Sequence, residues 1–301
     1  MAYKIFILFV FFATVSQAQN KKIDVYLDRD TQNGDVTIFA KNTTKVNYAV
    51  LISFSEIKNV QHGIPKTLTK TITPGTVTLL KLKKNVTNNR SISLRYNYSY
   101  IKGCIHSKVD KDIVYLIPTP EGIGVKLKLI KKIVSSSESE LPENWHIYGF
   151  EMRKGDTVFA ARRGVISKIQ KTNSAEQGNS IYHANRNEVE IMQPDCTFAN
   201  YKYLDKTLIT EGESVLAGQP IGIIRMNNVT KSSILIFSVN HHDIKAKGNK
   251  LASENKTIPL LFDIDGEGQK LIENNFYEST HSLKTITQEM KKREIKHYKK
   301  K

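Results

Sequence analysis

The chain has 301 residues, of which 45 are Lys or Arg and 29 are Asp or Glu, so its formal net charge is +16. This length suits two domains, and no segment is apolar for the roughly 20 residues that a transmembrane helix needs. For an exported protein the basic excess points away from nucleic acid and toward an anionic surface such as cell-wall polymer or lipid head groups. An ordinary basic secreted protein is the other interpretation.

The N-terminus has the features of a secretory signal. Lys4 precedes an apolar run from Ile5 to Val15, and small residues follow at Ser16 and Ala18. This pattern predicts a signal peptide over residues 1–18 and a soluble, exported chain, either periplasmic or extracellular. The first cysteine is Cys104, which leaves no N-terminal cysteine for a lipid anchor, so any surface attachment is expected to be non-covalent.

Residues 19–116 are predicted to form a β-sandwich. Asp24–Leu27 and Asp35–Ala40 alternate between polar and apolar residues around the turn dipeptide Asn33-Gly34, which predicts a hairpin. Further short β-branched or aromatic runs bring the total to roughly seven strands. No cluster of acids, bases or metal ligands stands out here.

A second β-rich domain is predicted over residues 117–265, after a junction at Ile117–Gly122. Residues 266–301 are then expected to be a short, poorly anchored basic helix or tail, with Leu283, Ile286, Met290 and Ile295 at roughly helical spacing. Its last eleven residues could tether the protein to an anionic envelope surface by charge, or be a frayed end. Both interpretations stay open at this stage.

Cys104 and Cys196 are the two cysteines of the chain. An oxidising compartment permits a disulfide between them, but the sequence does not show that they meet.

Four segments of the second domain carry a resemblance to a known family. They are "GDTVFAARRGVI" at 155–166, "PDCTFANY" at 194–201, "GESVLAGQPIG" at 212–222 and "TIPLLF" at 257–262. In this order they resemble the lysostaphin-type, LytM-like peptidoglycan endopeptidases. The resemblance implies an all-β duplicated hybrid motif fold, with Val158, Ala160, Val165, Val215, Ile221 and Phe237 inside.

The resemblance also implies a zinc site held by a histidine, an aspartate and the second histidine of an H-x-H strand, with two more histidines assisting water activation. In register, the aspartate position is Gly149, and the histidine of the family's YxHL segment is Tyr203. The H-x-H positions are Ile234 and Ile236, in a strand that alternates from Ser233 to Val239. The first histidine falls at Trp145, or near Ser135–Ser137 in members with a longer insertion. The predicted site therefore lacks its ligands, and no cofactor is expected.

Other residues offer a weaker zinc site. His146 and Glu151 are nearest but point to opposite faces of an extended strand unless a bulge intervenes. The run His241-His242-Asp243 is expected to be a solvated turn, and His183 a surface residue.

The leading prediction is a secreted, catalytically inactive relative that uses the groove for binding peptidoglycan or a cell-wall hydrolase. Tyr201 and Tyr203 could stack on sugar or peptide, while Lys202, Arg162 and Arg163 could meet carboxylates; alternatively they are a half-buried strand and solvated turn positions. Two further hypotheses are an active zinc endopeptidase with relocated ligands and a structural protein of the cell envelope. The residues predicted to line the groove are Gly149, Tyr201, Tyr203, Ile234, Ile236 and Arg162.

Overall fold

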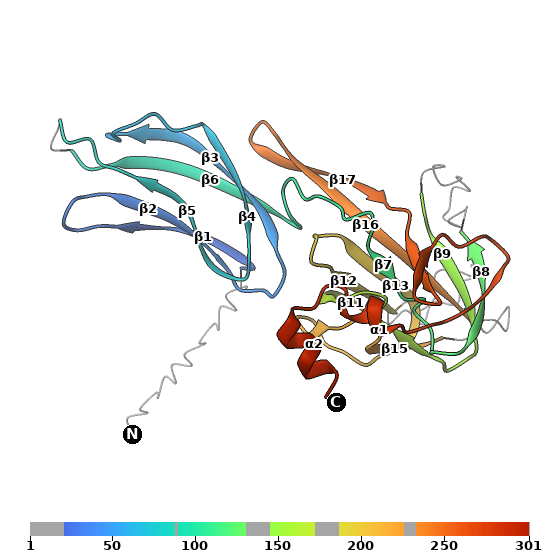
Figure 1. The fold of residues 1–301 in the computed structure, drawn as a ribbon. Coiled ribbons are helices and arrows are strands. Elements are labelled where there is room, and N and C mark those ends of the chain that lie inside the picture. Colours follow the sequence, from blue (N-terminus) through green and yellow to red (C-terminus); the bar gives the residue numbers. More distant parts are fainter. Residues whose placement is uncertain (1–20, 88–89, 131–144, 172–186, 226–232, 301) are drawn as a thin grey trace, which may run out of the picture.

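The computed structural model describes residues 21–87, 90–130, 145–171, 187–225 and 233–300 as two β-rich lobes, with the N-terminal lobe on the left of Figure 1. The predicted signal peptide, residues 1–18, lies outside the described residues. Within the described ranges, no helix is both long enough and apolar enough to cross a membrane.

The N-terminal lobe consists of two three-stranded antiparallel sheets, ordered β1-β2-β5 and β4-β3-β6. One hydrophobic cluster contains residues of both sheets, including Ile38 and Ile52, so the sheets pack face to face. This confirms the predicted β-sandwich, with six strands where about seven were expected. The strands are β1 (Ile23–Arg29), β2 (Val36–Asn42), β3 (Tyr48–Lys58), β4 (Thr67–Ile72), β5 (Gly75–Leu82) and β6 (Ser93–Lys102).

The first hairpin follows from its turn chemistry. Gly34 has a φ of 77° and its N–H donates to the carbonyl of Asp30. A glycine adopts this left-handed conformation without steric cost. The turn sets the register in which Arg29 pairs with Val36, so the predicted hairpin is present.

The second lobe is built on an eleven-stranded sheet whose main path runs β14-β11-β12-β13-β16-β9-β8-β20. Strands β10, β15 and β17 branch from it, and β19-β18-β7 form a separate small sheet. The strands are β7 (Val114–Tyr115), β8 (Gly124–Leu129), β9 (Tyr148–Met152), β10 (Thr157–Phe159), β11 (Gly164–Gln170), β12 (Asn187–Met192), β13 (Phe198–Thr207), β14 (Ser214–Val215), β15 (Pro220–Ile224), β16 (Ser233–Lys247), β17 (Lys250–Thr257), β18 (Leu261–Ile264), β19 (Glu267–Gln269) and β20 (Phe276–Glu278).

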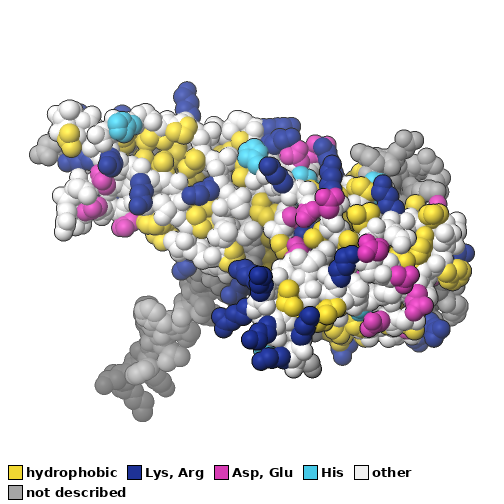
Figure 2. All heavy atoms as spheres, viewed as in Figure 1, with side chains coloured by type: hydrophobic (Ala, Val, Ile, Leu, Met, Phe, Trp, Pro, Cys, Tyr) yellow, Lys and Arg dark blue, Asp and Glu magenta, His cyan; other side chains and the backbone are white. Residues whose placement is uncertain are grey.

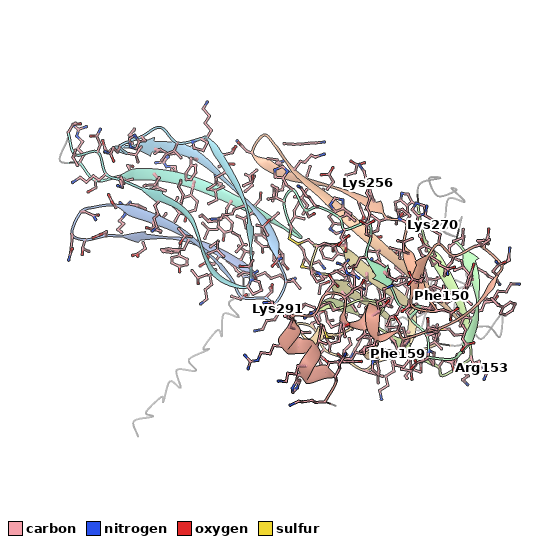
Figure 3. The ribbon with its side chains drawn as sticks, viewed as in Figure 1. Phe150, Arg153, Phe159, Lys256, Lys270 and Lys291 are labelled. Atoms are coloured by element: carbon pink, nitrogen blue, oxygen red, sulfur yellow. A yellow bond between two sulfur atoms is a disulfide. The ribbon has the colours of Figure 1, made fainter. Side chains whose placement is uncertain are left out.

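The core of this lobe contains most of the residues expected inside it. Phe150, which Figure 3 shows within the lobe, packs edge-to-face on Phe262 with ring centroids 5.7 Å apart. Of the six predicted interior residues only Val165 is partly exposed, and it packs against the core of the N-terminal lobe instead. Tyr115 and Ile117 also belong to this core, so the second lobe begins before the predicted junction.

The C-terminal segment is better anchored than expected. Leu271 lies in the core of the second lobe, and β20 pairs with β8. Ile286 of α1 (Leu283–Thr287) and Met290 are buried against Leu116. Only α2 (Lys292–Tyr298), which has no buried residue, resembles the predicted loose helix. The sequence shows the helical spacing of the apolar residues in the C-terminal segment, but it does not show the surface of the second lobe on which they pack.

Contacts of several kinds join the two lobes. Cys104 and Cys196 form a disulfide with their Cα atoms 5.9 Å apart, which answers the question that the sequence left open. Phe198 of the second lobe inserts into the N-terminal core. The isolated bridge between Ile105 and Ile244 lies beside the β16–β17 hairpin, which extends toward the N-terminal lobe in Figure 1. The lobes are therefore linked by covalent, apolar and backbone contacts.

Candidate functional site

The predicted groove lies on one face of β9 and β16. Leu235 and Phe237 are buried in the core, whereas Ile234 and Ile236 are half-buried on the opposite face, as the alternating pattern predicted. Ile236 pairs directly with Gly149 of β9. Residues that pair directly on neighbouring strands share a face of the sheet. The structure therefore brings together three of the four positions that the resemblance assigns to zinc chemistry.

The space at Gly149 is already occupied. A Cβ atom built on this glycine would lie 2.8 Å from Cδ1 of Ile234, 3.1 Å from Cδ1 of Ile130 and 3.2 Å from the carbonyl oxygen of Lys128. Contacts this short force a neighbour to move. The isoleucine side chain thus fills the place where the family's aspartate side chain begins.

Tyr203, the fourth aligned position, occupies a β-bulge. On the neighbouring strand, Asn187 pairs with Leu204 and Glu188 pairs with Lys202, so Tyr203 is the extra residue. Its φ is 71°, a left-handed conformation that is uncommon for a bulky residue and that clusters at functional sites. Its carbonyl oxygen accepts a hydrogen bond of 3.0 Å from the N–H of Arg225. The bulge is therefore held in place by the start of the next segment.

A row of directly paired residues crosses this face of the sheet, where the groove is predicted. From β8 to β12 the row is Lys128, Gly149, Ile236, Lys202 and Glu188; we call it the central row. Lys202 Nζ lies 3.7 Å from a carboxylate oxygen of Glu188, and Lys128 is ion-paired with Glu151, the partner of Ile234 on β9. This face of the sheet is thus apolar at its centre, with an ion pair on each side.

These residues do not fit a zinc ion. The four aligned positions supply no imidazole and no carboxylate, which are the groups that hold catalytic zinc. The isoleucines offer nothing to offset the desolvation of a divalent cation, and the nearest carboxylates on either side, Glu151 and Glu188, are paired with Lys128 and Lys202. Among the residues that the structure describes, no three His, Cys, Asp or Glu side chains are grouped closely enough to hold a metal ion.

A comparison with protein families gives a match to part of the chain. Residues 145–250 match the model of peptidase family M23. This segment is similar to that lysostaphin-type family. We call these residues the M23 segment.

Solved structures similar to the chain include lysostaphin, at 23% identity and a TM-score of 0.27, over 35% of this chain and 39% of that chain. The M23 metalloprotease pseudoalterin, from the deep sea, is 13% identical with a TM-score of 0.32, over 55% of this chain and 99% of that chain. A zinc-containing peptidase from Vibrio cholerae is 11% identical with a TM-score of 0.33, over 76% of this chain and 83% of that chain. The chain thus spans less than half of the lysostaphin structure. No curated protein sequence matches the chain.

Two of the residues predicted to line the groove of the M23 segment lie elsewhere. Tyr201 is 0% exposed, and its hydroxyl oxygen accepts a hydrogen bond of 2.8 Å from the N–H of Ala161. Burial raises the pKa of this phenol. Because its ring packs on Phe237 in the core, Tyr201 has no surface on which a ligand could stack, and the expectation of a binding role is corrected.

Arg162 is likewise absent from the groove and is 2% exposed. Its guanidinium donates to Asp195 at 3.0 Å and to Glu289 at 2.8 and 3.0 Å, and it lies over the ring of Tyr115. Burial alone would lower the pKa of Arg162, but Glu289, Tyr115 and Asp195 together raise it. Arg162 is therefore neither the predicted groove residue nor the alternative solvated turn position, but the centre of a buried ionic network.

Among the described residues, the histidines do not combine into a substitute site. His241 and His242 lie in β16 and pair with β17, so the predicted solvated turn at 241–243 is wrong. Nε2 of His241 is 2.9 Å from the hydroxyl oxygen of Ser107, His242 stacks on Phe198 with ring centroids 4.5 Å apart, and Asp243 accepts from Lys245 at 2.6 Å. Each of the three side chains has a different partner.

Glu151, the other candidate, is held by Lys128. His146 lies just before β9, and burial together with Lys270 lowers the pKa of its imidazole. His183 and Ser135–Ser137 lie outside the described residues.

Proposed function

We propose that this protein is an exported, catalytically inactive relative of the M23 peptidoglycan endopeptidases, and that its groove binds cell-wall peptide or a cell-wall hydrolase. The observation that carries the proposal is the pairing of Gly149 with Ile236, with Ile234 filling the space above the glycine. A side chain that fills the space above Gly149 opposes metal binding at this position while leaving the surrounding sheet intact. The fold is retained, and the ligand chemistry is replaced.

The composition of the groove supports a binding role. The half-buried Ile236 offers an apolar contact, and the ion pairs Lys128–Glu151 and Lys202–Glu188 on either side offer charged groups of both signs to a peptide. The strained bulge at Tyr203 places a tyrosine beside Lys202. A cell-wall peptide with charged groups matches this arrangement of apolar centre and flanking ion pairs.

The disulfide between Cys104 and Cys196 is consistent with export. M23 peptidoglycan hydrolases act outside the cytoplasm, and the N-terminal sequence fits a signal peptide. The proposed location is therefore the periplasm or the cell exterior, and the proposed partners are peptidoglycan or a hydrolase rather than nucleic acid.

The C-terminal end adds a second, weaker attachment to anionic envelope polymers. Lysine and arginine side chains gather on and around α2 in the view of Figure 2. The exposed basic residues here are Lys291, Lys292, Arg293, Lys296, Lys299 and Lys300. Attraction of this kind is screened within about 8 Å at physiological ionic strength, so this contribution to envelope binding should disappear at moderate salt.

A metal measurement tests the inactive state. The mature chain is loaded with zinc, freed of excess and analysed by native mass spectrometry. The expected result is a chain without stoichiometric zinc. One tightly bound zinc per chain would overturn the proposal and direct the search to His146 and His241.

A binding measurement tests the groove. Purified peptidoglycan sacculi are sedimented with the wild-type chain, with Lys202→Glu and with the matched control Lys206→Glu, which changes an exposed lysine four residues along the same strand. We expect Lys202→Glu to reduce sedimentation at least fivefold and the control to retain it. A purified cell-wall amidase replaces the sacculi in a second arm. Failure of the wild-type chain to bind either partner contradicts the proposed function.

A further inference from the structure

A basic cleft lies between the two lobes, next to the Glu188 end of the central row, where Gln170 of its lining pairs with Glu188. Its volume is about 750 Å³. The N-terminal lobe contributes Lys22, Tyr48, Tyr100 and Lys102, and the second lobe contributes residues 168–171 with Ser167 and Glu211. Both lobes are needed to form it, and the disulfide begins two residues after Lys102. The two walls are therefore held at a fixed separation.

The charge of the cleft is unbalanced. It is lined by four lysines and one glutamate. Lys102 is ion-paired with Glu190, but among the described residues Lys22, Lys168 and Lys171 have no carboxylate within ion-pair distance. Lys168 Nζ donates to Gln170 at 2.8 Å, and one oxygen of Glu211 accepts from the N–H of Ile169 at 2.7 Å. Three ammonium groups thus remain available to an anionic ligand.

An aromatic surface lies beside these charges. Tyr100 is 38% exposed, although large aromatic side chains are usually well buried. Its ring meets the buried ring of Tyr48 edge-to-face, with centroids 5.7 Å apart, which fixes its orientation. A tyrosine ring held in this way offers an apolar face together with a polar hydroxyl.

We propose that this cleft binds an anionic saccharide, a carbohydrate whose rings carry carboxylate or phosphate groups. The ring of Tyr100 stacks on a sugar face while Lys22, Lys168 and Lys171 bind the anionic substituents. Lysine acts as a point charge that accepts either substituent. The cleft and the groove share no residue, although Gln170 of the cleft pairs with Glu188 of the central row, and the proposal for the cleft does not depend on what the groove binds.

Isothermal titration of the full mature chain with four probes tests the proposal. Hexamannuronate carries carboxylates, phosphorylated maltohexaose carries phosphates, maltohexaose is neutral, and inorganic polyphosphate of matched charge lacks sugar. We expect one or both charged hexasaccharides to bind at least tenfold more tightly than maltohexaose and polyphosphate, and the tighter of the two identifies the anionic group. Equal binding of polyphosphate would reduce the cleft to a non-specific ionic surface and overturn the proposal, as would the absence of binding.

Matched variants locate the binding. The double variant Lys168→Gln and Lys171→Gln should lower the affinity for the charged hexasaccharide at least tenfold. The control, Lys247→Gln with Lys250→Gln, makes the same charge change at the tip of the β16–β17 hairpin and should leave the affinity unchanged. Tyr100→Leu should lower the affinity for the charged hexasaccharide at least threefold. Tyr26→Leu changes a tyrosine that is 39% exposed on the other sheet and should leave the affinity unchanged. Equal effects in test and control pairs contradict a site in the cleft, and circular dichroism shows that each variant remains folded.

Discussion

Arg162 and Arg163 are neighbours in the sequence with opposite surroundings. Arg162 is buried between Asp195 and Glu289, whereas Arg163 is partly exposed and pairs with the exposed Glu294 at 2.9 Å. Removing one partner of a buried ion pair leaves uncompensated charge in the interior. We therefore expect Arg162→Met to lower the free energy of unfolding by about 3 to 5 kcal/mol, measured by urea denaturation.

Arg163→Gln is the matched control for this prediction. It removes a partly exposed pair, which solvent and salt already screen, so its loss of stability should be much smaller than that of Arg162→Met. A similar, small effect of both changes would mean that the network around Arg162 contributes little. Asp195→Asn should then also be tolerated, although Arg162 and Thr197 hold the pKa of the Asp195 carboxyl below its usual range in spite of its burial.

His242 makes stability depend on pH. Burial is the largest cause that lowers the pKa of its imidazole, and the charges of Lys102 and His241 lower it further. Glu190 and the hydrogen bond to the Lys102 backbone act in the opposite direction but do not outweigh them. The unfolded chain binds the proton at His242 more readily than the folded chain does. The stability gained by burying the neutral imidazole is therefore fully present above the unfolded pKa of about 6.5. It is lost as the pH falls through the folded value. Melting temperatures between pH 7.5 and 5 should therefore fall less for His242→Phe than for the wild type.

The change to Phe keeps a ring against Phe198 while removing the titrating group. His62→Gln, at an exposed histidine of the N-terminal lobe, should leave the pH dependence unchanged. Some acid sensitivity will remain in His242→Phe, since burial also lowers the pKa of His146. An unchanged pH dependence in His242→Phe would exclude His242 as its source.

At the scale of single elements, the sequence predicts what local pattern determines. The alternation from Ser233 to Val239 correctly separates the buried Leu235 and Phe237 from Ile234 and Ile236. The turn at Asn33-Gly34 is equally well predicted, since glycine satisfies its positive φ. Both features depend on residues close together in the chain.

The errors arise where distant segments meet. Arg162 reads as a turn residue because its partner Glu289 is 127 positions away. Tyr201 reads as a groove residue because the bulge at Tyr203, which sets the faces of β13, has no signature in the sequence. The run 241–243 resembles a turn, but β17 pairs with it and continues the strand. The lysines of the cleft come from both lobes, so no local motif marks them.

The contact between β9 and β16 can be tested with a double-mutant cycle. Gly149→Ala places a methyl group 2.8 Å from Cδ1 of Ile234 and should lower the free energy of unfolding by about 1 to 3 kcal/mol, the usual range for overpacking. In an Ile234→Ala background the same change should be at least 0.5 kcal/mol milder, about the smallest coupling that such cycles resolve. Urea denaturation of the four chains provides the measurement.

Gly124→Ala is the control, because a Cβ at this strand glycine meets nothing within 4 Å and the residue has no positive φ. It should be close to neutral. Additive effects of Gly149→Ala and Ile234→Ala would show that Ile234 does not fill the space above Gly149, and would remove the main support for a closed metal site.

At the scale of the whole molecule, the lobes have separate cores and a shared boundary. Each core cluster draws mainly on one lobe, yet Met192 and Phe198 of the second lobe belong to the N-terminal cluster. The N–H of Asn47 also contacts the sulfur of Met192 at 3.3 Å. Apolar and polar contacts therefore hold the boundary together beside the disulfide, and they should keep the lobes associated when the covalent link is removed.

The disulfide between Cys104 and Cys196 closes a loop with a sequence separation of 92 residues. A cross-link over a loop of this length stabilises mainly by restricting the unfolded chain, typically by about 2 to 4 kcal/mol. We expect the double change to serine to lower the free energy of unfolding by that amount. Folded-state scattering and circular dichroism should stay unchanged, because Phe198 still anchors the boundary. Separation of the lobes in small-angle scattering would instead show that the covalent link alone orients them, and the cleft between them would then lose its anionic saccharide as well.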